Sequence, residues 1–193
     1  MSYMATYGGE KVSLATDSEM PSLNTIGISL SRLVRFAGHQ EGVYSVLAHS
    51  LTVAELMPPG EEIFGLMHDA QESLTSDVPR PMKCEQHSAI EDALYERICR
   101  AHGVPHPYPK GVYARVRVND NKALVAEATI IGYSSAMHDW FREEELVPDD
   151  EALAITRRHA RKVQRWMFAD DPQVTGRVFE RAFRKYMKTA GLA

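Results

Sequence analysis

Four histidine and aspartate side chains of this sequence could together hold a metal ion. His68 and Asp69 are adjacent in the apolar segment FGLMHDAQESL, His49 lies upstream in VLAHSLTVAEL, and Asp120 lies downstream in RVRVNDNKALVAEA. Adjacent residues project about 100° apart on a helix, so His68 and Asp69 can face one cleft and bind one ion. Imidazole nitrogens and carboxylate oxygens suit a divalent first-row metal. Because two nitrogens and two oxygens leave positions for water, the pattern predicts a hydrolytic metal centre.

Two further carboxylates could transfer protons beside such a metal. Glu72 lies four residues after His68 and three after Asp69, which is one helical turn along the same face. Asp77 follows in the next loop. Either side chain could activate water or protonate a leaving group. The alternative interpretation of each is a solvated carboxylate.

Basic residues near these positions could bind phosphate oxygens through charge-assisted hydrogen bonds. The candidates are Arg35, Lys83, Arg115 and Arg117. Lys83 ends a proline-rich loop and is placed to reach a phosphate tail. Arg115 and Arg117 are two residues apart and point in different directions on a helix, so we expect only one of them to contribute.

The elements that must position these side chains are helices. Apolar residues recur at helical spacing, prolines and glycines separate the segments, and no strand-like alternation persists. The predicted helices are Ile26–Phe36, Val43–Met57, Glu61–Leu74, Glu85–Ala101, 111–137, 149–169 and 174–189. The fold class is therefore predicted to be all-α, a bundle of roughly seven helices. Residues 1–24 are predicted to be a polar, extended or poorly ordered lead-in, and residues 25–190 a single domain.

Composition excludes several functional classes. A net charge of −4 argues against a general nucleic-acid surface, and 44% apolar residues suffice for a real core. The two cysteines, Cys84 and Cys99, form neither a zinc knuckle nor a disulfide framework. Because there is neither a secretory signal nor an apolar stretch of membrane-spanning length, we expect a soluble cytoplasmic protein.

Two segments carry a resemblance to a known family. His49-Ser-Leu-Thr-Val and the run from His68-Asp-Ala-Gln-Glu to Val-Pro-Arg-Pro-Met-Lys83 resemble the signature of HD-domain 5'-deoxynucleotidases. The stretches Arg35-Phe-Ala-Gly-His39 and Tyr44-Ser-Val-Leu-Ala-His49 are similar to the phage branch of that family, which includes phage dATP triphosphohydrolases. The resemblance covers roughly residues 24–130, and the last third of the chain carries no matching motif.

The resemblance implies a helical HD domain with a divalent metal, Mn, Co, Mg or Zn, on His49, His68, Asp69 and Asp120. It also implies water attack at the phosphorus nearest the sugar. The family's catalytic acids fall on Glu72 and Asp77, and its motif lysine on Lys83. Asp92 and Asp139 are alternatives to Asp120, but only Asp120 is in register with the matching segment KALVAEA.

One departure from the family concerns the nucleotide. The bacterial enzymes carry an Arg-Trp pair near it, whereas the aligned place here reads Gly38-His39. We therefore expect Arg35 or His39 to take over the binding of phosphate, and base recognition does not transfer from the family.

The expected function is hydrolysis of deoxynucleotides, most readily of a dNTP of the dATP type, because four candidate cations could serve a triphosphate. The alternatives are a 5'-deoxynucleotidase acting on dNMPs, a signalling-nucleotide phosphodiesterase and a non-catalytic nucleotide sensor. The expected partners are the deoxynucleotide and further copies of the chain, with no membrane and no nucleic-acid polymer. If a phage encodes the chain, its compartment would be the host cytoplasm.

Overall fold

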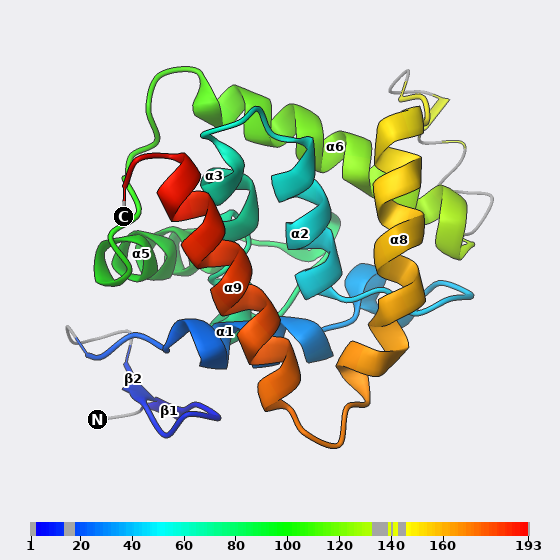
Figure 1. The fold of residues 1–193 in the computed structure, drawn as a ribbon. Coiled ribbons are helices and arrows are strands. Elements are labelled where there is room, and N and C mark those ends of the chain that lie inside the picture. Colours follow the sequence, from blue (N-terminus) through cyan, green and yellow to red (C-terminus); the bar gives the residue numbers. More distant parts are fainter. Residues whose placement is uncertain (1–2, 14–17, 133–138, 140, 143–145, 193) are drawn as a thin grey trace.

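Helices dominate the regular secondary structure in the described part of the chain (Figure 1). The computed structural model describes residues 3–13, 18–132, 139, 141–142 and 146–192. In chain order the elements are β1 (Met4–Ala5), β2 (Lys11–Val12), α1 (Leu23–Arg32), η1 (Arg35–Gly38), α2 (Val46–Leu56), α3 (Glu62–Met67), α4 (Glu72–Thr75), η2 (Arg80–Met82), α5 (Glu85–Ala101), α6 (Val112–Ile131), α8 (Asp150–Met167) and α9 (Gln173–Thr189). The prediction of an all-α bundle is confirmed.

A small antiparallel hairpin, β1 paired with β2, occupies part of the predicted lead-in. Strands of two residues are too short for alternation to show in a sequence, so the hairpin was not predicted. The Glu10 carboxylate accepts hydrogen bonds from the backbone N–H of Ser22 at 3.0 Å and from the Thr25 hydroxyl at 3.2 Å. The hairpin is thereby tied to the first turn of α1.

Helix α2 is the centre of the bundle. Every residue from Val46 to Ala54 is buried, and the helix packs against α1, α3, α6 and α8. A helix that is apolar around its whole circumference lies inside a domain, so the polar His49 is carried into the interior with it. Ser45 caps the helix by accepting a hydrogen bond from the N–H of Ala48 at 3.3 Å, and Pro58 follows soon after its end.

The first predicted helix ends earlier than expected. Helix α1 stops at Arg32, and Val34 forms an isolated antiparallel bridge with Ser45. The N–H of Arg35 then donates to the carbonyl of Tyr44 at 2.9 Å. These bonds to a distant segment replace the helical ones, so Arg35 starts a separate short turn instead of ending a helix.

The third predicted helix is interrupted at two of the predicted metal ligands. Helix α3 ends at Met67 and α4 begins at Glu72, so His68 and Asp69 lie in the turn between them and not in the middle of a helix. In this turn the N–H of Ala70 donates to the carbonyl of Met67, and that of Glu72 to the carbonyl of Asp69. These i to i+3 bonds make a tighter turn than the α-helix and rotate the side chains that follow.

Gly65 allows α3 to lie close against α2. A Cβ atom on this residue would come within 2.9 Å of the backbone nitrogen of Ala54 and within 2.8 Å of the Met57 side chain. Only a residue without a side chain fits this crossing. The close approach brings the turn after α3 up to the middle of α2, where His49 lies.

The later helices follow the sequence prediction closely. Helix α5 has the predicted bounds, and α8 and α9 begin and end within two residues of theirs. Helix α6 ends at Ile131, and the predicted continuation over 133–137 lies outside the described residues. No helix within the described ranges is long and apolar enough to cross a bilayer.

Candidate metal centre and adjoining cavity

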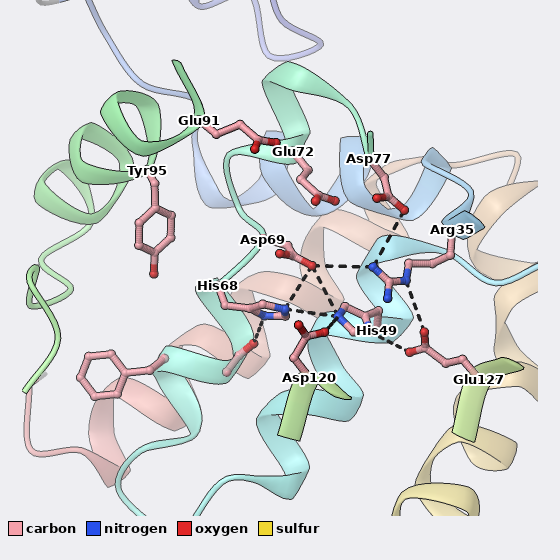
Figure 2. A network of polar contacts seen from close by, with 12 residues as sticks. Arg35, His49, His68, Asp69, Glu72, Asp77, Glu91, Tyr95, Asp120 and Glu127 are labelled. Atoms are coloured by element: carbon pink, nitrogen blue, oxygen red, sulfur yellow. Dashed lines mark hydrogen bonds and ion pairs between the residues drawn. The ribbon is translucent and has the colours of Figure 1, made fainter. Parts of the chain in front are cut away.

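His49 projects from the middle of α2 with no exposed surface. Its Nδ1 lies 2.7 Å from Oε1 of Glu127, a carboxylate on α6 (Figure 2). A carboxylate accepts, so Nδ1 carries the proton and donates. Nε2 then points the other way, toward His68, Asp69 and Asp120.

His68 is oriented in the same manner. Its Nδ1 lies 2.8 Å from the carbonyl oxygen of Gly65, which can only accept a hydrogen bond. Its Nε2 therefore faces the interior, 3.2 Å from Nε2 of His49 and 3.1 Å from Oδ2 of Asp69. Outer hydrogen bonds of this kind fix the ring orientation of histidines that bind metals.

Three of the four predicted ligands, His49, His68 and Asp69, form one cluster, and the fourth, Asp120, contacts it through His49. Nε2 of His49 lies 3.4 Å from Oδ2 of Asp69 and 3.1 Å from Oδ1 of Asp120. Asp120 comes from α6, on the other side of the cluster from the turn that carries His68 and Asp69 (Figure 2). The alternatives for the fourth position lie elsewhere, since Asp92 is exposed on α5 and Asp139 pairs with Arg142.

The donor set fits a divalent cation. His49, His68 and Asp69 each offer a ligand atom, and these atoms lie within 4.8 Å of one another. Ligands placed tetrahedrally at about 2.0–2.1 Å from Zn²⁺ lie about 3.3–3.4 Å apart, close to the spacing of the atoms that meet here. Lone pairs that converge in this way repel one another unless a proton or a cation lies between them. The His49-His68-Asp69 group could therefore bind a metal.

The charges of the metal-free protein agree with this interpretation. Burial and the Arg35 charge lower the pKa of His49, but Glu127 and Asp120 outweigh them and raise it to about 10. Burial acts to raise the pKa of Asp69 and Asp120, yet the neighbouring histidines hold both below their usual values. A protonated His49 thus lies among ionised carboxylates, and a metal ion that binds there must displace its proton.

Arg35 lies beside the cluster as a buried cation. Its Nε is 3.3 Å from Oε2 of Glu127, and its Nη1 is 4.0 Å from Asp69 and 3.9 Å from Asp77. Although burial opposes the charge, these carboxylates raise the pKa of Arg35 further above its usual range. The guanidinium group is charged at all relevant pH values and is held in place on several sides.

A cavity of about 510 Å³ opens beside the cluster. This volume is in the usual range for sites that bind small molecules. Its walls combine acids, cations and apolar side chains: Arg35, Phe36, Asp69, Glu72, Asp77, Val78, Pro79, Arg80, Pro81, Lys83, Asp120 and Leu124. The cavity thus holds two of the predicted ligands, both predicted acids and two of the predicted cations.

Glu72 is buried in the wall of this cavity, with only 3% of its surface exposed. Burial and the charges of Asp69 and Asp77 raise its pKa to about 10, and within the described part of the chain its Oε2 has no hydrogen-bond partner. Burial also raises the pKa of Asp77, although Arg35 opposes this. In the metal-free protein, Glu72 is therefore a neutral acid at pH 7, as a proton donor needs to be.

Lys83 reaches the cavity from the end of η2 but is not a free cation. Its Nζ lies 2.9 and 3.0 Å from the two oxygens of Glu91, a buried carboxylate of α5, and 3.9 Å from Glu72. Glu91 was not singled out in the sequence, because a single acid among the charged residues of α5 gives no signal. The ion pair fixes the position of the lysine at the cavity wall.

Three predicted substrate-binding residues are not brought to the cavity. His39 and Arg117 are exposed, and neither lines the cavity. Arg115 forms a two-point ion pair with Glu61, with contacts of 2.6 and 2.7 Å. Arg115 lies five residues before Asp120, which is about 140° around the helix, so its side chain leaves from another face.

Besides Glu91, three further polar or aromatic residues near the site were missed. Phe36, directly after Arg35, and Arg80, in the proline-rich loop, both line the cavity. Glu127 was also missed, although its spacing is a signal, since seven residues after Asp120 is two helical turns on the same face.

Strained backbone lies next to two residues of the site. Phe36 and Ala37, directly after Arg35, have φ angles of 57° and 50°, and Ser76, directly before Asp77, has a φ of 69°. Non-glycine residues in the left-handed region cost about 1–3 kcal/mol each and concentrate at functional sites.

Comparison with known proteins gives a partial match. No family model matches the chain. A curated relative, "Uncharacterized protein YfdR" of Escherichia coli (strain K12), is 32% identical over 108 residues. The match covers 54% of this chain and 61% of the relative, and the relative's name states no activity. The comparison therefore transfers no function, and the chemistry must be inferred from the site itself.

If the cluster binds metal, His68→Ala and Asp69→Ala should each lose it, because each change removes one of three closely spaced ligand atoms. Wild type should retain about one divalent ion per chain after dialysis against Mn²⁺ or Co²⁺, and both variants should retain far less. Elemental analysis after dialysis measures this. His39→Ala, which changes an exposed histidine away from the cluster, is the control and should match wild type. Full metal content in both ligand variants would rule out this centre.

Proposed function

We propose that the protein is a metal-dependent phosphohydrolase that cleaves deoxynucleotides at the α-phosphorus and releases a deoxynucleoside. One observation carries the proposal. A cluster of metal-ligating atoms from α2 and the turn after α3, with Asp120 of α6 in contact with it, lies beside a cavity that also contains the buried acid Glu72 and fixed cations. The resemblance of the His49, His68-Asp69 and Asp120 pattern to HD-domain 5'-deoxynucleotidases supports the choice of a deoxynucleotide.

His49, His68, Asp69 and Asp120 would hold the cation in this proposal. A divalent cation supplies Lewis acidity toward a phosphoryl oxygen and lowers the pKa of water. Arg35 would bind a phosphate oxygen from the neighbouring wall, because its Nη1 already lies near Asp69 at the edge of the cavity. A guanidinium group that is fixed in advance needs no reorganisation when the reaction adds charge to the phosphate.

Glu72 and Asp77 would divide the proton transfers between them. A water oxygen forms a bond to the α-phosphorus while the bond from phosphorus to the 5' oxygen of the sugar breaks. Glu72, whose burial in the cavity wall favours the protonated form, gives its proton to that 5' oxygen. Asp77, whose Oδ2 lies 3.9 Å from Nη1 of Arg35, takes a proton from the water. The products are a deoxynucleoside and the phosphate group that it carried.

The number of phosphates depends on the cations of the cavity. The sequence favoured a dNTP because four cations were candidates, but Arg115 and Arg117 lie outside the cavity. Arg35 and Lys83 remain, and Arg80 joins them at the wall. A dNMP is therefore a second candidate, favoured by this smaller set of cations. The dNTP stays the first, since Lys83 and Arg80 lie together in the loop region that ends at the cavity.

The decisive experiment is a panel of nucleotides with Mn²⁺, Co²⁺ or Mg²⁺ added, with the products separated. We expect a deoxynucleoside plus triphosphate from a dNTP, a faster reaction on dATP than on ATP, and no reaction in the presence of a chelator. Phosphate from dAMP alone would select the monophosphate candidate. Turnover of cyclic or signalling nucleotides alone, or nucleotide binding without turnover, would contradict the proposal.

Glu72→Gln should keep the metal and slow turnover by about 10²-fold or more, because general acid catalysis contributes about that much. The amide retains the size of the side chain but has no acidic proton to give. The rate at saturating substrate and the bound metal are measured on the same preparation. Glu85→Gln, which changes an exposed acid at the start of α5, should turn over like wild type. Normal turnover in Glu72→Gln would return Glu72 to a structural role.

Lys83→Ala should raise the KM for dATP about tenfold or more and the KM for dAMP far less. A charge-assisted hydrogen bond to a distant phosphate contributes about 1.5–3 kcal/mol, and only the triphosphate has such a phosphate. Steady-state kinetics on both substrates give the comparison. Lys122→Ala removes a lysine of α6 that pairs with Asp149 outside the cavity, and should change neither KM. Equal losses on both substrates would give the monophosphate candidate the lead.

A further inference from the structure

Glu127 is a fully buried carboxylate that belongs neither to the ligand set nor to the cavity wall. It projects from α6, two turns after Asp120, toward the side of His49 that faces away from the other ligands (Figure 2). Both of its oxygens are used. Oε1 accepts from Nδ1 of His49 at 2.7 Å, and Oε2 accepts from Nε of Arg35 at 3.3 Å.

The contacts of Glu127 close a ring around the site. His49 contacts Asp69 through Nε2 at 3.4 Å, and Asp69 contacts Arg35 through Oδ2 at 4.0 Å. Arg35 contacts Glu127 through Nε, and Glu127 contacts Nδ1 of His49, which closes the ring. One side chain therefore fixes the orientation of a metal ligand and of the cation beside it, although it touches neither the cavity nor the other ligands.

We propose that Glu127 is a positioning residue that sets the ligand tautomer of His49 and the direction of Arg35 at the same time. The inference rests on the proposed function, in which His49 holds the cation and Arg35 binds the phosphate. Helix α6 carries both Asp120 and Glu127, so a single rigid element places one ligand and orients another. Side chains that support a ligand in this way commonly change metal affinity by about 10–100-fold when they are replaced.

A glutamine at this position can satisfy only one of the two partners. If its carbonyl oxygen faces His49, its NH₂ group faces the N–H of Arg35, and two donors meet. If its NH₂ group faces His49, the proton of the imidazole must move to Nε2, and the lone pair needed by the metal is lost. Removing Arg35 as well favours the first orientation, because the NH₂ group then no longer meets a second donor and the carbonyl oxygen can face His49.

The test compares Glu127→Gln with the double variant Arg35→Met/Glu127→Gln. We expect the Kd for Mn²⁺ or Co²⁺, measured by calorimetry, to rise about 10–100-fold in Glu127→Gln. In the double variant the Kd should return to within about threefold of wild type, since His49 regains its acceptor. The KM for substrate should stay high in the double variant, because Arg35 is absent. The visible spectrum of bound Co²⁺ should change in the single variant and recover in the double variant.

Glu55→Gln is a matched control. Glu55 lies on α2 and, like Glu127, contacts one histidine and one arginine, His159 and Arg158, but it contacts none of the predicted ligands. Its replacement should leave the metal Kd and the Co²⁺ spectrum unchanged. Thermal unfolding of the metal-free variants separates a general loss of stability from a loss of metal affinity.

The possible failures are distinguishable. Wild type that binds no metal would overturn the proposed function itself. Wild type that binds metal, with an unchanged Kd in Glu127→Gln, would overturn the role of Glu127 and leave the proposed function standing. A Kd that rises in Glu127→Gln but does not recover in the double variant would show that Arg35 and His49 are not coupled through this side chain, and would overturn the proposed double role of Glu127.

Discussion

The rest of the site depends on one interaction: several hydrogen-bond acceptors converge in the interior of the helical bundle and require a positive charge between them. Nε2 of His49, Nε2 of His68 and Oδ2 of Asp69 lie 3.1–3.4 Å apart, and buried lone pairs at such distances need a positive charge between them. The arrangement persists because the outer nitrogens are held, one by the Gly65 carbonyl and one by Glu127. These outer bonds leave the inner nitrogens no role other than to accept a proton or a cation.

The packing of α2, α3 and α6 brings the predicted ligand atoms close together. Helix α2 is buried on all sides, which carries His49 inside, and Gly65 lets α3 pack directly on α2. The tight turn after α3 then presents His68 and Asp69 together. Helix α6 completes the site from the other side with Asp120. Each of these helices is held by apolar packing, so the stability of the bundle and the geometry of the centre have the same source.

Charge organises the space around the centre. Arg35 is almost completely buried and is surrounded by Asp69, Asp77 and Glu127, while Lys83 is paired with Glu91. Buried charges of this kind are costly to hold unless they are paired, and breaking one pair leaves its partner exposed to that cost. The cavity therefore offers a substrate cations that are already fixed in direction. The strained residues after Arg35 and before Asp77 are consistent with segments that are held in place for a task rather than relaxed.

The sequence alone determined the helical class, most helix bounds and the set of residues that meet at the centre. Those features follow from local patterns: apolar periodicity, proline and glycine breaks, and a histidine-aspartate pair among apolar residues. Only the tertiary structure decided where two helices end, which cations reach the cavity and what Glu127 contacts, because these features depend on contacts between distant segments. The first helix ends earlier than predicted because the N–H of Arg35 donates to the carbonyl of Tyr44. The third predicted helix is interrupted by the tight turn at His68. Arg115 turned away to Glu61, and the place of Glu127 behind His49 became visible only once α6 had packed beside α2. A spacing of seven residues indicates a shared helix face, but only packing decides what that face meets.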